Sequence, residues 1–416
     1  MGRELRGAVA TFLTMAYILF ANPNILKDAG VPFGPAMAAT ALAAGVCCIL
    51  MGVLANFPVA LASGMGLNAI VAYQIAARAG SWQVAMGVIV LDGLIVLLLV
   101  LCGLREAVMN AIPRELRLAI GAGIGLFIAF IGMKNAGLVR SGVPLVSWGL
   151  VTSKTTLVAI FGLLLTAVLL ARQVTGAFVV GILASTALAL LLGVSRVPDT
   201  VSAPRFDTLF RADITGALRP ALLPLLFSVI LVDFFDTLGT VTGLAHQADL
   251  VDERGRIPAL RRILLVDSLS ASIGGLCGAS SVTCYIESAS GIAEGARTGL
   301  HSVFVGIMFL LAIFLAPLAS IVPPEATAPA LVLVGFLMMA QIALVNFGDL
   351  DISIPAFITL IVIPFTWSIS HGIGYGFIAF VVIKAARGRF AQVHPLMYLA
   401  AAAFAAGFVV ESLAAR

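Results

Sequence analysis

The sequence predicts an all-α, polytopic membrane protein built from two inverted repeats of seven spans. Three observations lead to this fold class. The chain is 61% hydrophobic and only 11% charged, which is more apolar side chain than a soluble domain of this length can bury. Apolar runs long enough to cross a bilayer recur from one end to the other. Two of these runs are interrupted by Gly and Ser at corresponding places in the two halves, which is typical of transporters.

The predicted spans fall into two groups of seven. The first group covers residues 8–26, 36–55, 58–78, 82–103, 114–133, 155–171 and 176–193, and a polar connection follows at 195–219. The second group covers residues 220–245, 262–279, 282–298, 301–322, 328–346, 354–370 and 372–387. An odd number of spans per group requires the second group to be inverted. The apolar stretch Leu396–Val410 has no counterpart in the first half, and it fits either an extra span or a surface helix.

Basic residues gather on one side of this arrangement. The side carries Arg3, Arg6, Arg105, Arg114, Arg117, Arg254, Arg256, Arg261, Arg262, Lys384, Arg387 and Arg389. This bias predicts a cytoplasmic N-terminus in the cytoplasmic (inner) membrane, although the 195–219 loop places further arginines on the opposite side. A net charge of +4 gives no reason to expect a nucleic-acid partner, and the five cysteines show no metal-ligand spacing.

The two interrupted segments are residues 281–299 and residues 58–69. Each begins as a short strand-like piece and then reaches small and polar residues that open a helix. Non-helical backbone is stable at membrane depth only where protein buries it or a wet cavity solvates it. We therefore expect the two segments to face each other, with the amide groups of their helix N-termini directed at one cavity.

Acidic residues at membrane depth are candidate site residues, because each is expensive in lipid. Glu287 lies in the second broken segment, and Asp233 and Asp236 share one face of an earlier helix. The functional interpretation is a substrate anchor and a proton carrier. The alternative is a structural pair, and of the two Asp236 is the more typical of a structural residue. For Asp92 and Asp267 we favour hydrogen bonding between helices.

Other polar residues allow two interpretations. Asn68 could bind a ligand or only begin its helix. Thr11, Thr14 and Tyr17 could line the cavity or simply pack. His246 could exchange a proton, but exposure near the end of its span is the simpler interpretation.

Several stretches together resemble the AzgA-like purine permeases, the hypoxanthine–adenine–guanine branch of the nucleobase/ascorbate transporter superfamily. They are Thr11–Phe20 followed by Asn22-Pro23, Gly64–Ala69, Gly121–Phe130, Phe235–Thr240, Tyr285–Gly291 and Arg297–Gly299. The resemblance covers essentially the whole chain. The chain departs from the family pattern at Ser63, where proline is expected, and at Val282 and Cys284, which replace hydroxyl-rich positions.

The resemblance implies a uracil-permease-like fold of 14 spans, with short antiparallel strands in spans 3 and 10. Residues 1–103 and 220–322 would form a core domain. Residues 104–219, including the linker, and 323–393 would form a gate domain. Residues 394–416 would be a C-terminal apolar helix of uncertain placement.

The resemblance also implies proton-coupled purine uptake, with the proton as coupling ion and no other cofactor or metal. Glu287 and Asp233 would contact the purine, and Asn68 would line or support the pocket. Asp236 would join these two acids in proton coupling. The remaining expected substrate-binding residues are Gly66, Tyr285 and Ser288. Phe234, Phe235 or Tyr285 would stack on the base.

The expected partners are a purine nucleobase and the lipid bilayer, with a homodimer as a candidate assembly. Two alternatives keep the same fold but transport another nucleobase (xanthine or uracil) or a small anion. An intramembrane enzyme is disfavoured, since the sequence contains no catalytic or nucleotide-binding motif. The sequence leaves open the preferred purine, the proton stoichiometry, the oligomeric state and the conformation.

Overall fold

The computed structural model describes residues 1–103, 112–142, 145–196, 203–252 and 257–414, without the side chains of residues 235, 238, 318–320 and 410–414. Among the described residues, nine helices are long and apolar enough to cross a membrane, and three shorter apolar helices accompany them. The polytopic all-α class is confirmed. Arg105, Arg254 and Arg256, which we placed on the cytoplasmic side, lie outside the described part of the chain.

The elements follow the predicted spans closely. The first half contains α1 (Gly2–Met15), α2 (Ile18–Asp28), α3 (Phe33–Leu50), η1 (Met51–Ala55), β1 (Leu61–Ser63), α4 (Met65–Ile70), η2 (Val71–Ile75), α5 (Ala76–Ala79), α6 (Trp82–Leu101), α8 (Arg114–Asn135), β2 (Val139–Ser141), β3 (Val146–Trp148), α9 (Lys154–Ala171) and α10 (Ala177–Leu191).

The second half begins with α11 (Ile214–Ala217) and η3 (Pro220–Leu222). It continues with α12 (Leu223–Gln247), α13 (Leu260–Cys277), β4 (Val282–Cys284), α14 (Ser288–Ala293), α15 (Gly299–Ala312), η4 (Ile313–Ile321), α16 (Pro324–Met339), η5 (Ala340–Leu344), α17 (Leu350–Thr366), α18 (Ile369–Ala386), η6 (Phe390–Gln392) and α19 (Pro395–Ala414).

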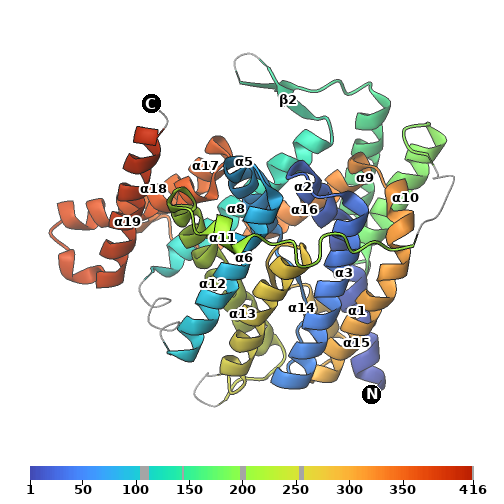
Figure 1. The fold of residues 1–416 in the computed structure, drawn as a ribbon, viewed down its shortest axis with the longest axis horizontal. Helices are drawn as coiled ribbons and strands as arrows, with labels where there is room; N and C mark the ends of the chain where they lie inside the picture. The colour runs from blue at the N-terminus through green and yellow to red at the C-terminus, as the bar shows by residue number, and fades with distance from the viewer. Residues whose placement is uncertain (104–111, 143–144, 197–202, 253–256, 415–416) are drawn as a thin grey trace.

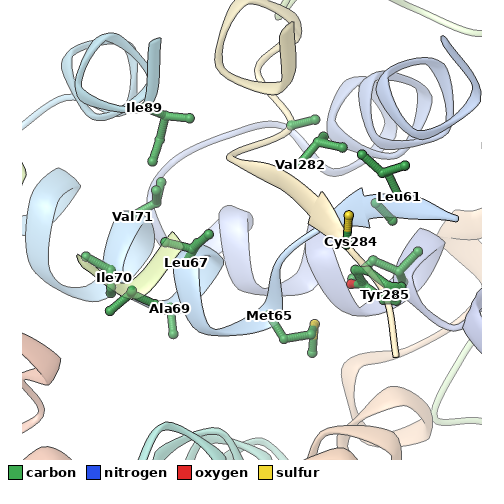
Figure 2. Packing of buried hydrophobic residues seen from close by; sticks show 14 of the residues in the cluster. Leu61, Met65, Leu67, Ala69, Ile70, Val71, Ile89, Val282, Cys284 and Tyr285 are labelled. Carbon is green, nitrogen blue, oxygen red and sulfur yellow. The ribbon is translucent and has the colours of Figure 1, made fainter. Parts of the chain in front are cut away.

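The two broken segments meet as an antiparallel pair of strands. β1 pairs with β4 in the register Leu61↔Cys284, Ala62↔Thr283 and Ser63↔Val282. Figure 2 shows the two strands side by side, with Tyr285 directly after β4 and the helix that carries Leu67 after β1. All six strand residues are buried, so protein encloses this non-helical backbone, as its position at membrane depth requires.

Contacts divide the helices into two groups. One group, here called the strand-bearing group, comprises α1–α6 and α12–α15 with both strands, and the other, the flanking group, comprises α8–α10 and α16–α18. The division into a core domain and a gate domain, and the movement of one relative to the other, stay predictions. Residues of the predicted linker bind the strand-bearing group, because Phe210 and Asp213 donate backbone hydrogen bonds to Leu276 and Gln83.

Inverted-repeat equivalents also meet in the flanking group. α8 and α16 are the fifth span of each half, and they cross at Gly125 and Gly335. A Cβ at Gly125 would lie 2.6 Å from the Gly335 carbonyl oxygen, and one at Gly335 would lie 2.3 Å from the Gly125 carbonyl oxygen. Only glycine allows these backbones to approach so closely. Equivalent elements therefore pair at two places, β1 with β4 and α8 with α16.

The molecule has two distinguishable ends (Figure 1). The N-terminus and the α12–α13 connection lie at one end, here called the N-terminal end, and the β2–β3 hairpin lies at the other, here called the hairpin end. At the N-terminal end, the buried Asp351 of α17 forms ion pairs with Lys384, Arg387 and Arg389. These three basic residues were predicted to lie together on one side.

Helix α19 packs antiparallel to the first half of α18. The Phe404 ring lies edge-on to Phe377, with centroids 5.9 Å apart, and the Phe408 ring stacks on His371 in the first turn of α18, with centroids 5.0 Å apart. Near the start of α19, the Tyr398 hydroxyl donates to the Phe390 carbonyl of η6, 3.2 Å away. Both interpretations of this stretch, an extra span or a surface helix, stay predictions.

Candidate functional site

Glu287 lies where the second broken segment turns from strand to helix. It occupies the position before the first residue of α14, and its side chain is half-buried. The Tyr17 hydroxyl, which is carried between α1 and α2, donates to Glu287 Oε1 at 2.8 Å. The carboxylate is thus held by a neighbouring helix while part of it stays accessible.

Tyr285 and Ser288 are buried and bind the first broken segment. The Tyr285 hydroxyl donates to the Ser63 carbonyl at 2.5 Å. The Ala60 amide donates to Ser288 Oγ at 2.9 Å, and the Tyr285 amide donates to the Ala60 carbonyl at 2.9 Å. In this conformation both side chains hold the two broken segments together, beside the β1–β4 pair. Their contact with a substrate stays a prediction.

The N-terminus of α14 differs from the expectation that its amide groups point at a cavity. The Ser288 and Ala289 amides donate to the carbonyls of Tyr285 and Ile286, at 3.2 and 2.9 Å. The turn between strand and helix therefore uses these amide groups, which periodicity cannot reveal. Glu287, which precedes the first residue of α14, is the charged side chain at this turn.

Asp233 and Asp236 lie in different environments although they belong to one helix. Asp233 is fully buried, and its Oδ1 lies 3.5 Å from Ser281 Oγ, which donates to it. Asp236, one turn later, is exposed. The interpretation of Asp236 as the more structural residue of the pair, and both functional roles, stay predictions.

The exposed face of α12 continues from Asp236 toward the N-terminal end. Gly239, Gly243 and His246 follow on this face and are exposed. A Cβ built on Gly239 or Gly243 would meet no atom within 4 Å. A carboxylate on this face is too costly to place against acyl chains. Asp236 is therefore accessible in this conformation, and the predicted exposure of His246 is confirmed.

Asp267 supports the second strand. The Thr237 hydroxyl donates to Asp267 Oδ2 at 2.7 Å, and the Cys284 amide donates to Oδ1 at 3.2 Å. The predicted hydrogen bonding between helices is confirmed for Asp267. Asp92 is also fully buried, and its hydrogen bonding between helices stays a prediction.

The first broken segment is closed on all sides. Asn68 is fully buried, and its Nδ2 donates weakly to the Ser63 carbonyl at 3.4 Å. A Cβ at Gly66 would lie 2.7 Å from Ile124 Cγ2 of α8, so the flanking group packs directly on this glycine. The predicted substrate contacts of Asn68 and Gly66 therefore require movement away from the present packing.

Three residues of the first predicted span form hydrogen bonds with the second broken segment or with the helix that follows it. Besides the Tyr17 bond to Glu287, Thr14 Oγ1 lies 3.1 Å from Ser290 Oγ, and Thr11 Oγ1 lies 2.9 Å from His301 Nε2. Tyr17 is thus a site residue whose contact with Glu287 sequence reasoning missed, since packing explained it equally well. Phe234 is buried, and the Phe235 side chain, also expected to stack on the base, lies outside the described side chains.

The sequence matches the permease family over residues 2–375. The chain belongs to this family. It is 43% identical to the adenine permease AdeP of Escherichia coli, over 96% of the chain and 91% of that protein. It is 40% identical to the guanine/hypoxanthine permease PbuG of Bacillus subtilis, over 95% of the chain and 93% of that protein. The resemblance to purine permeases seen in the sequence is confirmed.

Solved structures confirm the fold. The transmembrane domain of the cyanobacterial bicarbonate transporter BicA superposes with a TM-score of 0.64, over 92% of this chain and 96% of that domain, at 15% identity. At such low identity the likeness concerns architecture alone. This permease accordingly has a uracil-permease-like fold. Its family and its permease relatives indicate a membrane transporter and not an enzyme. Within its described residues, no group of three or more His, Cys, Asp or Glu side chains is arranged to hold a metal.

Proposed function

We propose that this permease is a proton-coupled symporter that takes up purine nucleobases: guanine, hypoxanthine or adenine. The observation that carries the proposal is the half-buried carboxylate of Glu287, which follows the β1–β4 pair. The Tyr17 hydroxyl donates a hydrogen bond to Glu287 Oε1 at 2.8 Å. A charged group in that position needs hydrogen-bond donors, and the edge of a purine supplies them. The names of the purine permeases among its relatives support the same substrate class.

The chemistry suits a flat, uncharged ligand with alternating donors and acceptors. One carboxylate can accept two N–H bonds from such an edge, and bonds to a charged acceptor are the strong kind. The Tyr17 hydroxyl already occupies one position on Glu287. The base would therefore either share the carboxylate with Tyr17 or displace its hydroxyl.

Proton coupling is the finer part of the proposal. Asp236 is exposed on the open face of α12, so it can exchange a proton with water. Glu287 is the second carboxylate of the site, and Asp233 is a buried third. Protonation of such groups at membrane depth lowers the cost of burying them. Proton binding and substrate binding would then favour the same occluded state.

The expected location is the cytoplasmic membrane, with the N-terminal end in the cytoplasm. The bias of basic residues toward that end supports this orientation. A homodimer stays a prediction without further support.

The test is uptake of labelled guanine, hypoxanthine and adenine by proteoliposomes with an imposed pH gradient, with and without a protonophore. Uptake that depends on the gradient and is abolished by the protonophore is expected. Gradient-independent uptake would contradict proton coupling but leave purine transport standing.

Competition separates the purine proposal from the anion alternative. Excess unlabelled guanine should suppress uptake, and excess sulfate should leave it unchanged. The acids Asp233, Asp236 and Glu287 disfavour an anionic substrate, because ionised carboxylates repel it. Sulfate uptake in the absence of any purine uptake would overturn the proposal.

A further inference from the structure

Aromatic side chains close the contact between the two helix groups at the hairpin end. Trp367, which follows α17, lies edge-on to Tyr73, Phe127 and Phe130, with ring centroids 5.7, 5.6 and 5.4 Å apart. Tyr73 belongs to the strand-bearing group, whereas the other three belong to the flanking group. The Tyr73–Trp367 contact therefore joins the two groups.

A lysine covers the aromatic contact from outside. Lys134 Nζ, at the end of α8, lies 5.3 Å from the Trp367 ring centroid and 5.9 Å from that of Tyr73. A cation over two aromatic faces is attracted to both. On the other side, the Tyr73 hydroxyl donates to Asp28 Oδ2 at 2.8 Å. We call Tyr73, Phe127, Phe130, Lys134 and Trp367 the Trp367 cluster.

Hydrogen bonds between the same two groups flank the Trp367 cluster. The hydroxyls of Ser368 and Ser370 donate to Gln74 Oε1 at 3.4 and 3.3 Å. Asn24 Nδ2 of α2 donates to Thr327 Oγ1 of α16 at 2.9 Å. The closure at the hairpin end thus has an aromatic centre with polar contacts beside it.

The backbone of Trp367 supports a specific role for its side chain. Trp367 ends α17 in the left-handed conformation, with φ of 54°. Glycine is the usual residue at such a helix end, and a bulky side chain there is strained. Strain of this kind persists where the surrounding structure requires it. The ring contacts of Trp367 are the evident compensation.

The opposite end offers a contrast. Beside α12 the exposed face from Asp236 to His246 borders open space, as Gly239 and Gly243 show. The Trp367 cluster thus closes the seam between the groups at the hairpin end, whereas Asp236, Gly239, Gly243 and His246 on one face of α12 are exposed.

We propose that the Trp367 cluster is the gate of the hairpin end, and that the Tyr73–Trp367 contact must separate before the site can open to that side. The inference concerns the movement of the two groups and holds whatever substrate the permease carries. Lys134 stabilises the closed state through its contacts with both rings. Phe127 and Phe130 keep Trp367 in place on the flanking side.

The test uses Ile124→Cys as a reporter, because Ile124 is buried deeper in the same seam, against Gly66. The exposed Cys102 is first replaced by serine. A membrane-impermeant maleimide is added to sealed vesicles of known orientation, from the side of the hairpin end. Labelling is then compared between the parent chain and chains that also carry Trp367→Ala, Lys134→Ala or Phe365→Ala. Phe365 is the matched control, since it is 81% exposed at the end of the same helix.

Labelling from the hairpin side should be slow in the parent and in Phe365→Ala. It should rise about tenfold in Trp367→Ala, which corresponds to a tenfold shift of the open–closed equilibrium, and less in Lys134→Ala. Parent-like labelling in folded Trp367→Ala would overturn the proposal. If Trp367→Ala does not fold, Trp367→Phe should give an intermediate rate.

Trp367→Gly separates the ring from the backbone strain. It relieves the strained φ but removes the ring, so labelling should rise as in Trp367→Ala. A parent-like rate in this variant would show that the ring does not close the seam. No purine is needed in any of these measurements, so failure of the gate and failure of the purine proposal are distinguishable.

Discussion

The two broken segments have the same backbone plan but different surroundings. Each is a three-residue buried strand followed by a helix, and the strands pair with each other. The first segment is fully enclosed from Val59 to Ala72. The second exposes Ile286 to 54% and leaves Glu287 and Ser290 half-buried.

Polar groups in the first segment form hydrogen bonds to other parts of the fold. The Ser63 hydroxyl donates to the Ala279 carbonyl at 2.6 Å. Cys48 Sγ accepts from the Leu61 amide at 3.1 Å and donates to the Leu61 carbonyl at 3.2 Å. The second segment instead presents a carboxylate to accessible space. Two segments of the same backbone plan therefore differ: the polar groups of the first bind other parts of the fold, and the second exposes part of a carboxylate.

The largest expected effect is that of Glu287→Gln. Two lost charge-assisted bonds, at about 1.5–3 kcal/mol each, correspond to a loss of purine uptake of roughly 100-fold or more. The amide can still accept from Tyr17, so membrane abundance should be retained. Initial uptake rates, normalised to protein in the membrane, are the measurement. Glu294→Gln, at the exposed end of α14, is the control. Near-normal uptake by Glu287→Gln would contradict the proposed contact between Glu287 and the substrate.

The next effect concerns stability. Asp267→Asn cannot accept both the Thr237 hydroxyl and the Cys284 amide in the present geometry, and the buried groups left unpaired cost about 2–4 kcal/mol. A lower unfolding temperature in detergent is expected. Ser228→Ala is the control, because the buried Ser228 hydroxyl donates to the Pro224 carbonyl of its own helix at 2.9 Å. Equal unfolding temperatures for parent and Asp267→Asn would show that the Asp267 carboxylate does not stabilise the second strand.

A smaller effect is expected for Tyr17→Phe. The substitution removes one hydroxyl bond to Glu287 and keeps the contact of the ring with Phe178, whose centroid lies 5.0 Å away. A bond of about 1–2 kcal/mol gives roughly a five- to thirtyfold change in uptake efficiency. Tyr375→Phe, at an exposed ring, serves as the control. Unchanged uptake would mean that Glu287 needs no positioning by Tyr17.

The smallest effect is expected for Asn68, and it tests whether the first segment only supports the fold. Asn68→Leu removes a buried amide whose hydrogen bond to Ser63 is long, at 3.4 Å. If this segment is support only, uptake should fall less than about fivefold, since a weak bond contributes below about 1 kcal/mol. A larger rise in KM with unchanged maximal rate would instead assign Asn68 to the substrate.

Sequence reasoning reached the fold because the signals were strong and local. Apolar runs predicted the helices, and the small residues Ser63, Gly64 and Gly66 and the polar stretch 281–299 marked where two of them break. The pairing of the two breaks followed from the resemblance and from their corresponding positions in the two halves. At each end of an element the differences are small, as for the span predicted at 262–279 and observed at 260–277.

The site was harder to predict, because burial is a property of tertiary packing. Asp233 and Asp236 look alike in sequence, yet one is enclosed beside Ser281 and the other faces open space. Tyr17 lies 270 positions from Glu287, and no periodicity links residues so far apart. The Trp367 cluster likewise assembles from η2, α8 and the residue after α17, which no local sequence pattern links.

The antiparallel packing of α19 on α18 bears on the compartments that the two chain ends occupy. With the 14 predicted spans both termini would face one compartment, and a crossing by α19 would send them to opposite compartments. A fluorescent or enzymatic reporter placed ahead of Met1 would then signal from the other side of the bilayer than one attached after Arg416. Truncation of the chain before Pro395 would restore the same-side arrangement, and it would also uncover the aromatic face of α18 around Phe377, against which Phe404 packs.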